Sequence, residues 1–235
     1  MSTEYQAVQW NRQKRRYDAV LVSAVGLFLA GFVVAGKVFF PHVTDEILLM
    51  RAFGVAAFAL LHGILCVGPL CRLDPGFLPL LYNRRHAGVT MALLALVHGV
   101  LALVTYHAGG DTQPVVSLFT ASPLVPSPAG VPFQVFGFVA LWILLLMAAT
   151  SHDFWLANLG APVWKALHML VYAAYGLLVL HVVFGVLQAE TGWLPAVATG
   201  CGLLTVLGLH GAAGWREARG DRGPCASAGA AGEDQ

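Results

Sequence analysis

The chain has 235 residues, of which 58% are hydrophobic and only 11% are charged. Soluble domains have about 25% charged residues, so this chain has too few charged side chains to cover a surface that faces water. The mean hydropathy of +0.73 agrees, and the composition predicts an integral membrane protein. The net charge of +1 gives no sign of nucleic-acid binding. The four cysteines show neither a disulfide framework nor a CxxC metal pair.

Six uncharged, mostly apolar runs have the length that a helix needs to cross a bilayer, roughly 20 residues. They are Ala19–Gly36, Ala52–Leu70, Ala87–Tyr106, Phe133–Ala149, Leu167–Leu187 and Trp193–Ala213. None of them contains Asp, Glu, Lys or Arg, as the cost of a charge inside lipid requires. Each must be a helix, because an open strand leaves backbone groups unpaired in lipid. The sequence therefore predicts an all-α integral membrane protein, a bundle of six transmembrane helices.

The basic residues set the orientation of this bundle. Eleven of the 13 lysines and arginines fall on one side of the predicted membrane: Arg12, Lys14, Arg15, Arg16, Arg72, Arg84, Arg85, Lys165, Arg216, Arg219 and Arg222. Only Lys37 and Arg51 fall on the other. Because cytoplasmic loops are enriched in Lys and Arg, both termini are predicted to be cytoplasmic.

The chain divides into three predicted parts. Residues 1–18 form a basic cytoplasmic N-terminus without a cleavable signal, residues 19–215 form one membrane domain, and the charged, Gly/Ala-rich residues 216–235 are expected to be disordered. The longest connection, His107 to Pro132, is rich in proline and glycine and predicts an irregular extracytoplasmic loop. We find no internal repeat and no phosphate-binding glycine loop.

The nine histidines fall into two groups. His42, His107 and His152 lie at or beyond span ends, where water or headgroups can satisfy them. The other six lie within spans or in their first turns: His62, His86, His98, His168, His181 and His210. An ionisable residue inside a membrane is a functional candidate, although any one of these alone is equally compatible with a hydrogen bond between helices.

Four of these histidines match in depth on two parallel spans, the third and the fifth. His86 and His168 lie one and three residues after the last basic residue before each span, and His98 and His181 lie thirteen and sixteen after it. At about 1.5 Å rise per residue, the members of a pair differ in depth by roughly 3–5 Å, and the two levels are roughly 18–20 Å apart. This pattern suits two b-type haems, each held by one neutral imidazole from each helix.

The angular spacing counts against this arrangement. At about 100° per residue, twelve residues rotate a helix position by roughly 120° and thirteen by roughly 220°. The two histidines of one helix therefore do not share a face. Tilt, a kink, or haems approached from different sides are needed to reconcile the spacing with two sites.

The stretch "TSHDFWLANLGAPVWKALHMLVYAAYGLLVLH" resembles the ferric reductase-like transmembrane domain family, and within it the haem-binding membrane subunit of the bacterial periplasmic methionine sulfoxide reductase system. The matching elements in this stretch are Thr150-Ser151, Leu159-Gly160, Trp164, Leu167-His168, Val171-Tyr172 and His181. Span 3 adds Arg84, Arg85, Gly88 and His98 in "RRHAGVTMALLALVH", and the second span ends in Gly68-Pro69-Leu70, as in the family. The resemblance covers about residues 47–190.

The resemblance implies a bundle that holds one or two bis-histidine b-type haems between spans 3 and 5. His98, His168 and His181 match ligand positions of the family, whereas His86 departs from the closest subfamily and matches ferric reductases more broadly. His62 also departs from the pattern and is a substitute ligand, a quinone-site group or a packing residue. We weigh His210, near the cytoplasmic end of span 6, as a further inner-haem ligand.

Two basic residues at the start of span 3 have more than one possible role. Arg84 and Arg85 are candidates to bind haem propionates or a flavin phosphate, or to anchor the helix at the headgroups. A flavin mononucleotide or a quinone is a further candidate cofactor.

The implied function is electron transfer across a bacterial inner membrane. With no nucleotide-binding domain in the sequence, we expect a separate donor, either a cytoplasmic flavin reductase or membrane quinol. The acceptor is expected to be an extracytoplasmic redox protein such as a methionine sulfoxide reductase. A direct ferric or other metal reductase uses the same residues. A haem-free transporter or anchor subunit that uses histidines for metal or protons is the alternative from another class, and the absence of repeated halves and of helices broken at mid-membrane argues against it.

Overall fold

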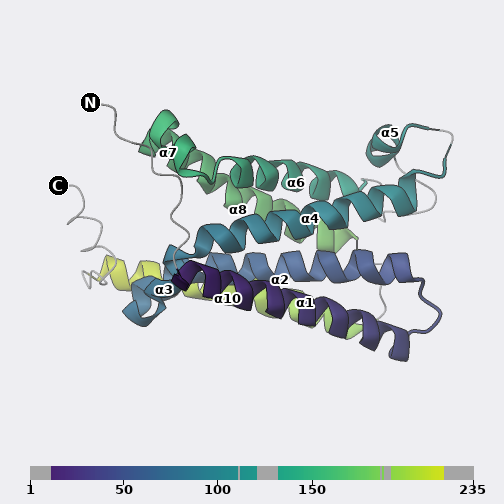
Figure 1. Ribbon diagram of the computed structural model, residues 1–235, viewed down its shortest axis with the longest axis horizontal. Helices are drawn as coiled ribbons and strands as arrows, with labels where there is room; N and C mark the ends of the chain where they lie inside the picture. Colours follow the sequence, from purple (N-terminus) through teal and green to yellow (C-terminus); the bar gives the residue numbers. More distant parts are fainter. Residues whose placement is uncertain (1–11, 111, 121–131, 186, 188–191, 220–235) are drawn as a thin grey trace.

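Five long apolar helices and one bent helix pair run side by side in the computed structural model, which describes residues 12–110, 112–120, 132–185, 187 and 192–219 (Figure 1). The long helices are α1 (Arg12–Phe39), α2 (Asp45–Leu73), α4 (Arg84–His107), α8 (Ala161–Phe184) and α10 (Trp193–Ala218). Each is long and apolar enough to cross a membrane, and α6 (Gln134–Ala149) with α7 (Asp153–Leu159) forms a further candidate span bent by 91°. The chain is thus a multi-pass membrane protein, all-helical over the described residues, with five candidate spans, or six if the bent pair counts as one.

Short helices lie at the two ends of this bundle. The 3-10 turn η1 (Pro75–Phe77), α3 (Leu78–Tyr82) and α7 lie at the end where α1 begins and α10 ends (Figure 1). The helix α5 (Pro114–Phe119) lies at the opposite end. It occupies part of the connection that we expected to be irregular, so that expectation is wrong for these six residues. Pro114 stands in the first turn of α5, a position that proline favours.

The helix ends also differ from the predicted spans. α1 begins at Arg12 rather than Ala19, because the basic residues before the apolar run are themselves good helix formers. α10 continues to Ala218, three residues into the segment predicted to be a tail. The remainder of that tail (220–235), residues 1–11 of the N-terminal segment and residues 121–131 of the long connection lie outside the described residues.

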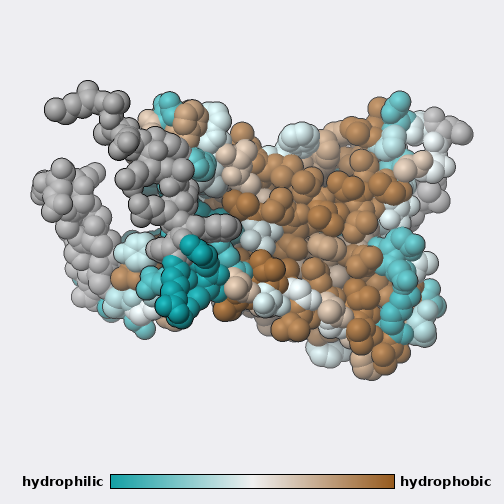
Figure 2. All heavy atoms as spheres, viewed as in Figure 1, coloured by the Kyte–Doolittle hydropathy of each residue, from teal (hydrophilic) through white to brown (hydrophobic). Residues whose placement is uncertain are grey.

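On the face shown in Figure 2, apolar side chains cover the middle of the bundle, between two more hydrophilic ends. Large side chains of the long helices are open to the surroundings: Val22 is 64% exposed, Leu27 75% and Leu204 71%. Contiguous apolar surface of this extent is not found on soluble monomers. Lipid is the medium that covers it, in agreement with the composition.

The interior of the bundle is built from α2, which packs against α1, α4 and α10, and from α6, which packs against α4 and α8. Their shared core consists of Leu61, Leu65, Met91, Ala140, Leu144, Ala174, Tyr175 and Val206. Ala140 and Ala174 are fully buried, as expected where small residues let helix backbones approach closely in lipid. At the end that carries α3, Arg216 donates to the carbonyl of Leu73 at 2.8 Å and joins α10 to α2.

Gly36 marks a close approach of α1 to α2. A Cβ atom built on Gly36 would lie 2.6 Å from Cδ2 of Leu48, whose side chain is itself buried. We expect Gly36→Ala to destabilise the protein by about 1–3 kcal/mol through overpacking, measured as a fall in Tm in detergent. Gly31→Ala on the same helix meets nothing within 4 Å, so its Tm should be unchanged or slightly raised. Equal effects from the two substitutions would contradict the packing assigned to α1.

Candidate functional site

Two of the predicted histidines face each other between α4 and α8. The ring centroids of His98 and His181 are 6.4 Å apart, and their planes are inclined by 78°. Both side chains are partly buried. The structure therefore brings together the pair that the depth comparison assigned to the outer level.

Each of these two imidazoles is anchored to the backbone of a neighbouring helix. His98 Nδ1 donates to the carbonyl of Met50 on α2 at 2.9 Å, and His181 Nδ1 donates to the carbonyl of Phe133, which caps α6, at 3.0 Å. A carbonyl oxygen only accepts, so the bond fixes the proton on Nδ1 and leaves Nε2 as the atom available to a metal. Metal-binding histidines are commonly oriented in this way by a backbone carbonyl.

The spacing of the pair fits a single metal ion between the two rings. Metal–imidazole bonds of about 2.0–2.1 Å, with each ring centre roughly 1.1 Å beyond its nitrogen, put two opposed rings about 6.2–6.4 Å apart. The observed 6.4 Å agrees. The pair thus has the ligand type, the protonation and the separation of a bis-imidazole haem site.

His168 has a different environment, nearer the end where α8 begins. Its Nδ1 donates to the carbonyl of Trp164 in its own helix at 3.0 Å, and its ring stacks on the Trp164 indole with centroids 3.8 Å apart. Its Nε2 is the one buried side-chain nitrogen or oxygen of the described residues that lacks a hydrogen-bond partner. A buried polar atom left in this state is costly, and a bound metal ion or ligand donor would satisfy it.

The structure does not show the predicted inner pair in contact. His86 Nδ1 lies 2.7 Å from Oδ1 of Asp18, which ties α4 to α1. The described partners of His168 are Trp164 and the backbone of Met147. The pairing of His86 with His168 around one iron therefore stays a prediction.

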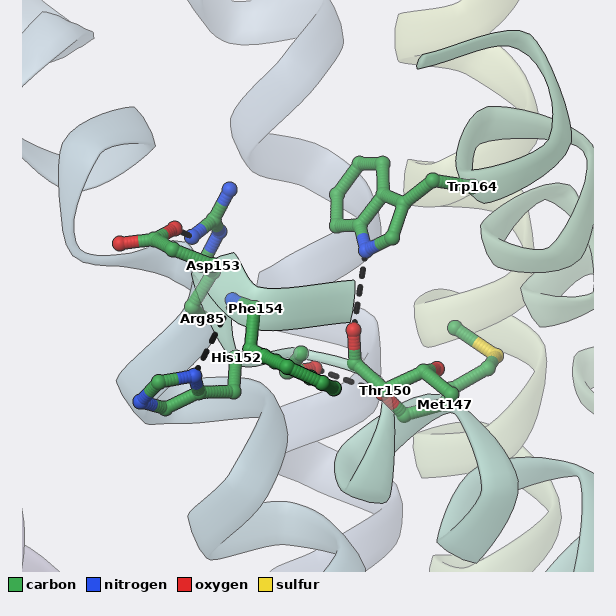
Figure 3. Close-up of polar contacts among 8 residues, drawn as sticks. Arg85, Met147, Thr150, His152, Asp153, Phe154 and Trp164 are labelled. Atoms are coloured by element: carbon green, nitrogen blue, oxygen red, sulfur yellow. Dashed lines mark hydrogen bonds and ion pairs between the residues drawn. The ribbon is translucent and has the colours of Figure 1, made fainter. Parts of the chain in front are cut away.

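Arg85 contacts Trp164, the residue on which His168 stacks. The Arg85 guanidinium lies 5.3 Å from the centre of the Trp164 ring and forms an ion pair with Asp153, at the start of α7 (Figure 3). The Trp164 indole nitrogen donates to the carbonyl of Thr150 at 2.9 Å, where α6 ends. These contacts join α4, the bend between α6 and α7, and the first turns of α8 around the face of His168.

Arg84 reaches α2. A Cβ atom built on Gly68 would lie 3.7 Å from Nη1 of Arg84, so the Arg84 guanidinium lies near this residue of α2. Of the two adjacent arginines, Arg85 is the one whose guanidinium lies over the ring of Trp164.

His62 and His210 are satisfied on both ring nitrogens. His62 Nδ1 donates to the carbonyl of Phe58 at 2.8 Å, and its Nε2 lies 3.1 Å from the hydroxyl of Tyr175. His210 bonds in the same way to its own helix and, at 3.1 Å, to Tyr172. These bonds favour the packing interpretation of His62. Sequence reasoning assigned no such role to the two tyrosines, because no local pattern joins residues 38 or 113 positions apart.

His107 corrects a further expectation. We expected water or headgroups to satisfy it at the end of its span, but its side chain is only 5% exposed and bonds to the Ser117 hydroxyl at 2.8 Å. The helix α5, which the sequence did not predict, supplies this partner. His152 accepts from the backbone N–H of Phe154 and caps α7 (Figure 3).

Comparison with known proteins identifies a matching family and several similar chains, two of which are named below. The family described as ferric reductase like transmembrane component matches residues 53–179. The haem-binding subunit MsrQ of protein-methionine-sulfoxide reductase from Deinococcus radiodurans is 34% identical over 119 residues, 51% of this chain and 54% of its own length. The MsrQ protein of Azospira oryzae is 32% identical over 133 residues, 57% of this chain and 52% of its own. The chain thus spans about half the length of the curated relatives that it matches.

Trp164 provides a test of the contacts around His168. Trp164→Phe keeps an aromatic ring against the imidazole but removes the indole N–H, so the carbonyl of Thr150 loses its donor. We expect a loss of about 0.5–1.5 kcal/mol in the free energy of unfolding, measured as a fall in Tm in detergent. Trp142→Phe is the matched control, because Trp142 is 60% exposed on the lipid-facing surface. A fall in Tm that is no larger for Trp164→Phe than for the control would argue against the assigned hydrogen bond.

Proposed function

The chain belongs to the ferric reductase-like transmembrane family, and on that premise we propose that it is a membrane b-type cytochrome subunit that passes electrons across the bilayer. The observation that supports this most strongly is the pair His98 and His181, with ring centres 6.4 Å apart and each Nδ1 held by a carbonyl of another helix. Ring centres at this separation fit two imidazoles that hold one haem iron through Nε2.

We propose that His98 and His181 would hold a haem b at the outer level. The haem, when bound, supplies one-electron oxidation and reduction of its iron. The protein's own residues orient the two imidazoles and keep a proton on each Nδ1. Two imidazoles that hold one haem suit electron transfer rather than the binding of a small molecule.

At the inner level we propose His168 as the principal ligand, on the basis of its buried Nε2 without a partner. A second haem held by His86 and His168 is the arrangement that the sequence predicts. A flavin mononucleotide or a quinone at this level is the alternative. In either case Arg84 and Arg85 are the candidate donors to a propionate or a phosphate, since guanidinium groups form strong bonds with both.

We further propose the direction and the partners of electron transfer. The asymmetry of basic residues supports a cytoplasmic location for both termini. The bacterial sources of the similar chains support a bacterial inner membrane. Electrons would enter on the cytoplasmic side from a flavin reductase or from membrane quinol. Because the similar chains are named haem-binding subunits of protein-methionine-sulfoxide reductase, we propose such a reductase as the extracytoplasmic acceptor.

The family description also supports direct reduction of Fe(III) at the outer haem as a second candidate. The transporter alternative has less support. Within the described part of the chain, no three His, Cys, Asp or Glu side chains form a group that could hold a bare metal ion, whereas a haem needs only two. An acceptor assay with Fe(III) chelate and with an oxidised methionine-containing protein plus its reductase separates the two electron-transfer functions.

Haem binding at the outer level can be tested by spectroscopy. The purified protein is expected to show a b-type reduced-minus-oxidised spectrum, with haem per chain measured as the pyridine adduct. His98→Ala and His181→Ala should each remove the same component of this spectrum, because each substitution removes one of the two ligands of the same haem. His42→Ala, an exposed position outside the spans, should leave it unchanged. Wild-type protein without haem, after expression with adequate haem supply, would refute the cytochrome assignment.

The inner level needs a separate comparison. If His86 and His168 share an iron, wild-type protein will contain two haems per chain, and His86→Ala and His168→Ala will each reduce this to one. One haem per chain in the wild type, retained in His86→Ala, would show that the inner level holds no bis-histidine haem. That result would leave the outer site unaffected.

A further inference from the structure

The two outer histidines contact neighbouring helices in the same way. We call each contact a seat: a backbone carbonyl that accepts from the imidazole, and a glycine beside the imidazole ring. His98 donates to the carbonyl of Met50, and a Cβ atom built on Gly54 would lie 2.7 Å from its Nδ1. His181 donates to the carbonyl of Phe133, and a Cβ atom built on Gly137 would lie 2.8 Å from its Nδ1. In both seats the glycine follows the accepting residue by four positions.

Helix geometry explains why a glycine stands at this position. In an α-helix the carbonyl of one residue points toward the N–H four residues later. The Cα–Cβ bond of that later residue leans back toward the helix N-terminus, so a side chain there covers the carbonyl. A glycine leaves the carbonyl open from the side, and an imidazole of another helix can then reach it.

The same seat occurs twice in the chain at a constant offset of 83 residues. His98 follows its acceptor Met50 by 48 positions, and His181 follows Phe133 by 48. The sequence around each glycine also matches, with Phe-Gly-x-x-Ala-x-x-x-Leu at 53–61 and again at 136–144. The Ala and Leu of both copies are buried. This short match corrects our expectation that the chain has no internal repeat, so the absence of repeated halves no longer counts against the transporter alternative.

We propose that Gly54 and Gly137 are equivalent positioning residues, and that the outer site is built from two matching helical hairpins, α2–α4 and α6–α8. Each hairpin supplies one imidazole, one carbonyl that orients it, and one glycine that admits it. The inference rests on the proposed function only for the identity of the group that the imidazoles hold.

The equivalence does not extend to the inner level. The position 83 residues before His168 is Arg85, and the Arg85 guanidinium indeed lies beside Trp164, on which His168 stacks. One hairpin thus presents an imidazole where the other presents a guanidinium. The matched seats therefore define the outer pair alone as a symmetric site.

The first test measures haem at the outer site in Gly54→Ala and Gly137→Ala. Each added methyl group displaces an imidazole, so both variants should lose the spectral component that His98→Ala and His181→Ala lose, or show it with altered low-spin electron paramagnetic resonance signals. Gly63→Ala on α2 and Gly176→Ala on α8 are the matched controls, because nothing lies within 4 Å of a Cβ atom at either position. Wild-type spectra in Gly54→Ala and Gly137→Ala would overturn the proposal.

The second test uses haem-free protein and covers the case in which a glycine variant folds poorly. If Gly54→Ala lowers Tm because its methyl group meets His98, then the same substitution in a His98→Ala background will lower Tm much less. Gly137→Ala should be rescued in the same way by His181→Ala. The crossed combinations, such as Gly54→Ala with His181→Ala, should show no rescue.

These double-mutant comparisons separate the two proposals. Specific rescue in apo protein supports the seats even if the wild-type protein proves to bind no haem, which would defeat the proposed function alone. If the histidine substitutions do not relieve the effect of the glycine substitutions, or relieve it equally in crossed pairs, the glycines serve helix packing in general and the proposal fails.

Discussion

An imidazole inside a bilayer has to find a partner for each of its ring nitrogens, because no water is available there and an unsatisfied polar group is costly. Five histidines of this bundle show three different arrangements of their ring nitrogens. His62 and His210 bond to their own helix and to a tyrosine, which occupies both nitrogens. His98 and His181 use Nδ1 on a carbonyl of a second helix, and His168 bonds to its own helix and leaves Nε2 buried and unpaired.

The difference between these arrangements separates structural histidines from candidate ligands. A ring satisfied on both sides stabilises the contact between helices and offers nothing to a metal. A ring held from outside its own helix is oriented by the fold rather than by its own rotamer, and it keeps one nitrogen for a ligand. The packing of α2 against α4 and of α6 against α8 is therefore also what aims His98 and His181 at one another.

Much of this fold follows from composition and charge, since a chain with six uncharged apolar runs has few alternatives to a helical bundle in lipid. The family follows from motifs that the sequence displays directly, above all "RRHAGVTMALLALVH" and the stretch that ends at His181. What the sequence could not show are contacts that depend on the rotation of each helix, such as Tyr175 on His62 or Ser117 on His107. Nothing in the sequence distinguishes Gly54 and Gly137 from the other glycines, of which the chain has 26 in all. The repeat matches at few positions, so it is recognised only after the contacts of His98 and His181 identify these two glycines.

The unequal outcome for the two predicted pairs has the same physical origin. Along a helix, one residue changes depth by only about 1.5 Å but changes direction by about 100°. A comparison of depths therefore tolerates errors of two or three residues, whereas a comparison of directions tolerates almost none. His86 and His98 are twelve residues apart, roughly 120° around α4, and the structure directs the first toward Asp18 on α1 and the second toward α2 and His181. The comparison of depths identified four histidines as candidates. The direction in which each side chain leaves its helix shows that two of them, His98 and His181, lie next to each other.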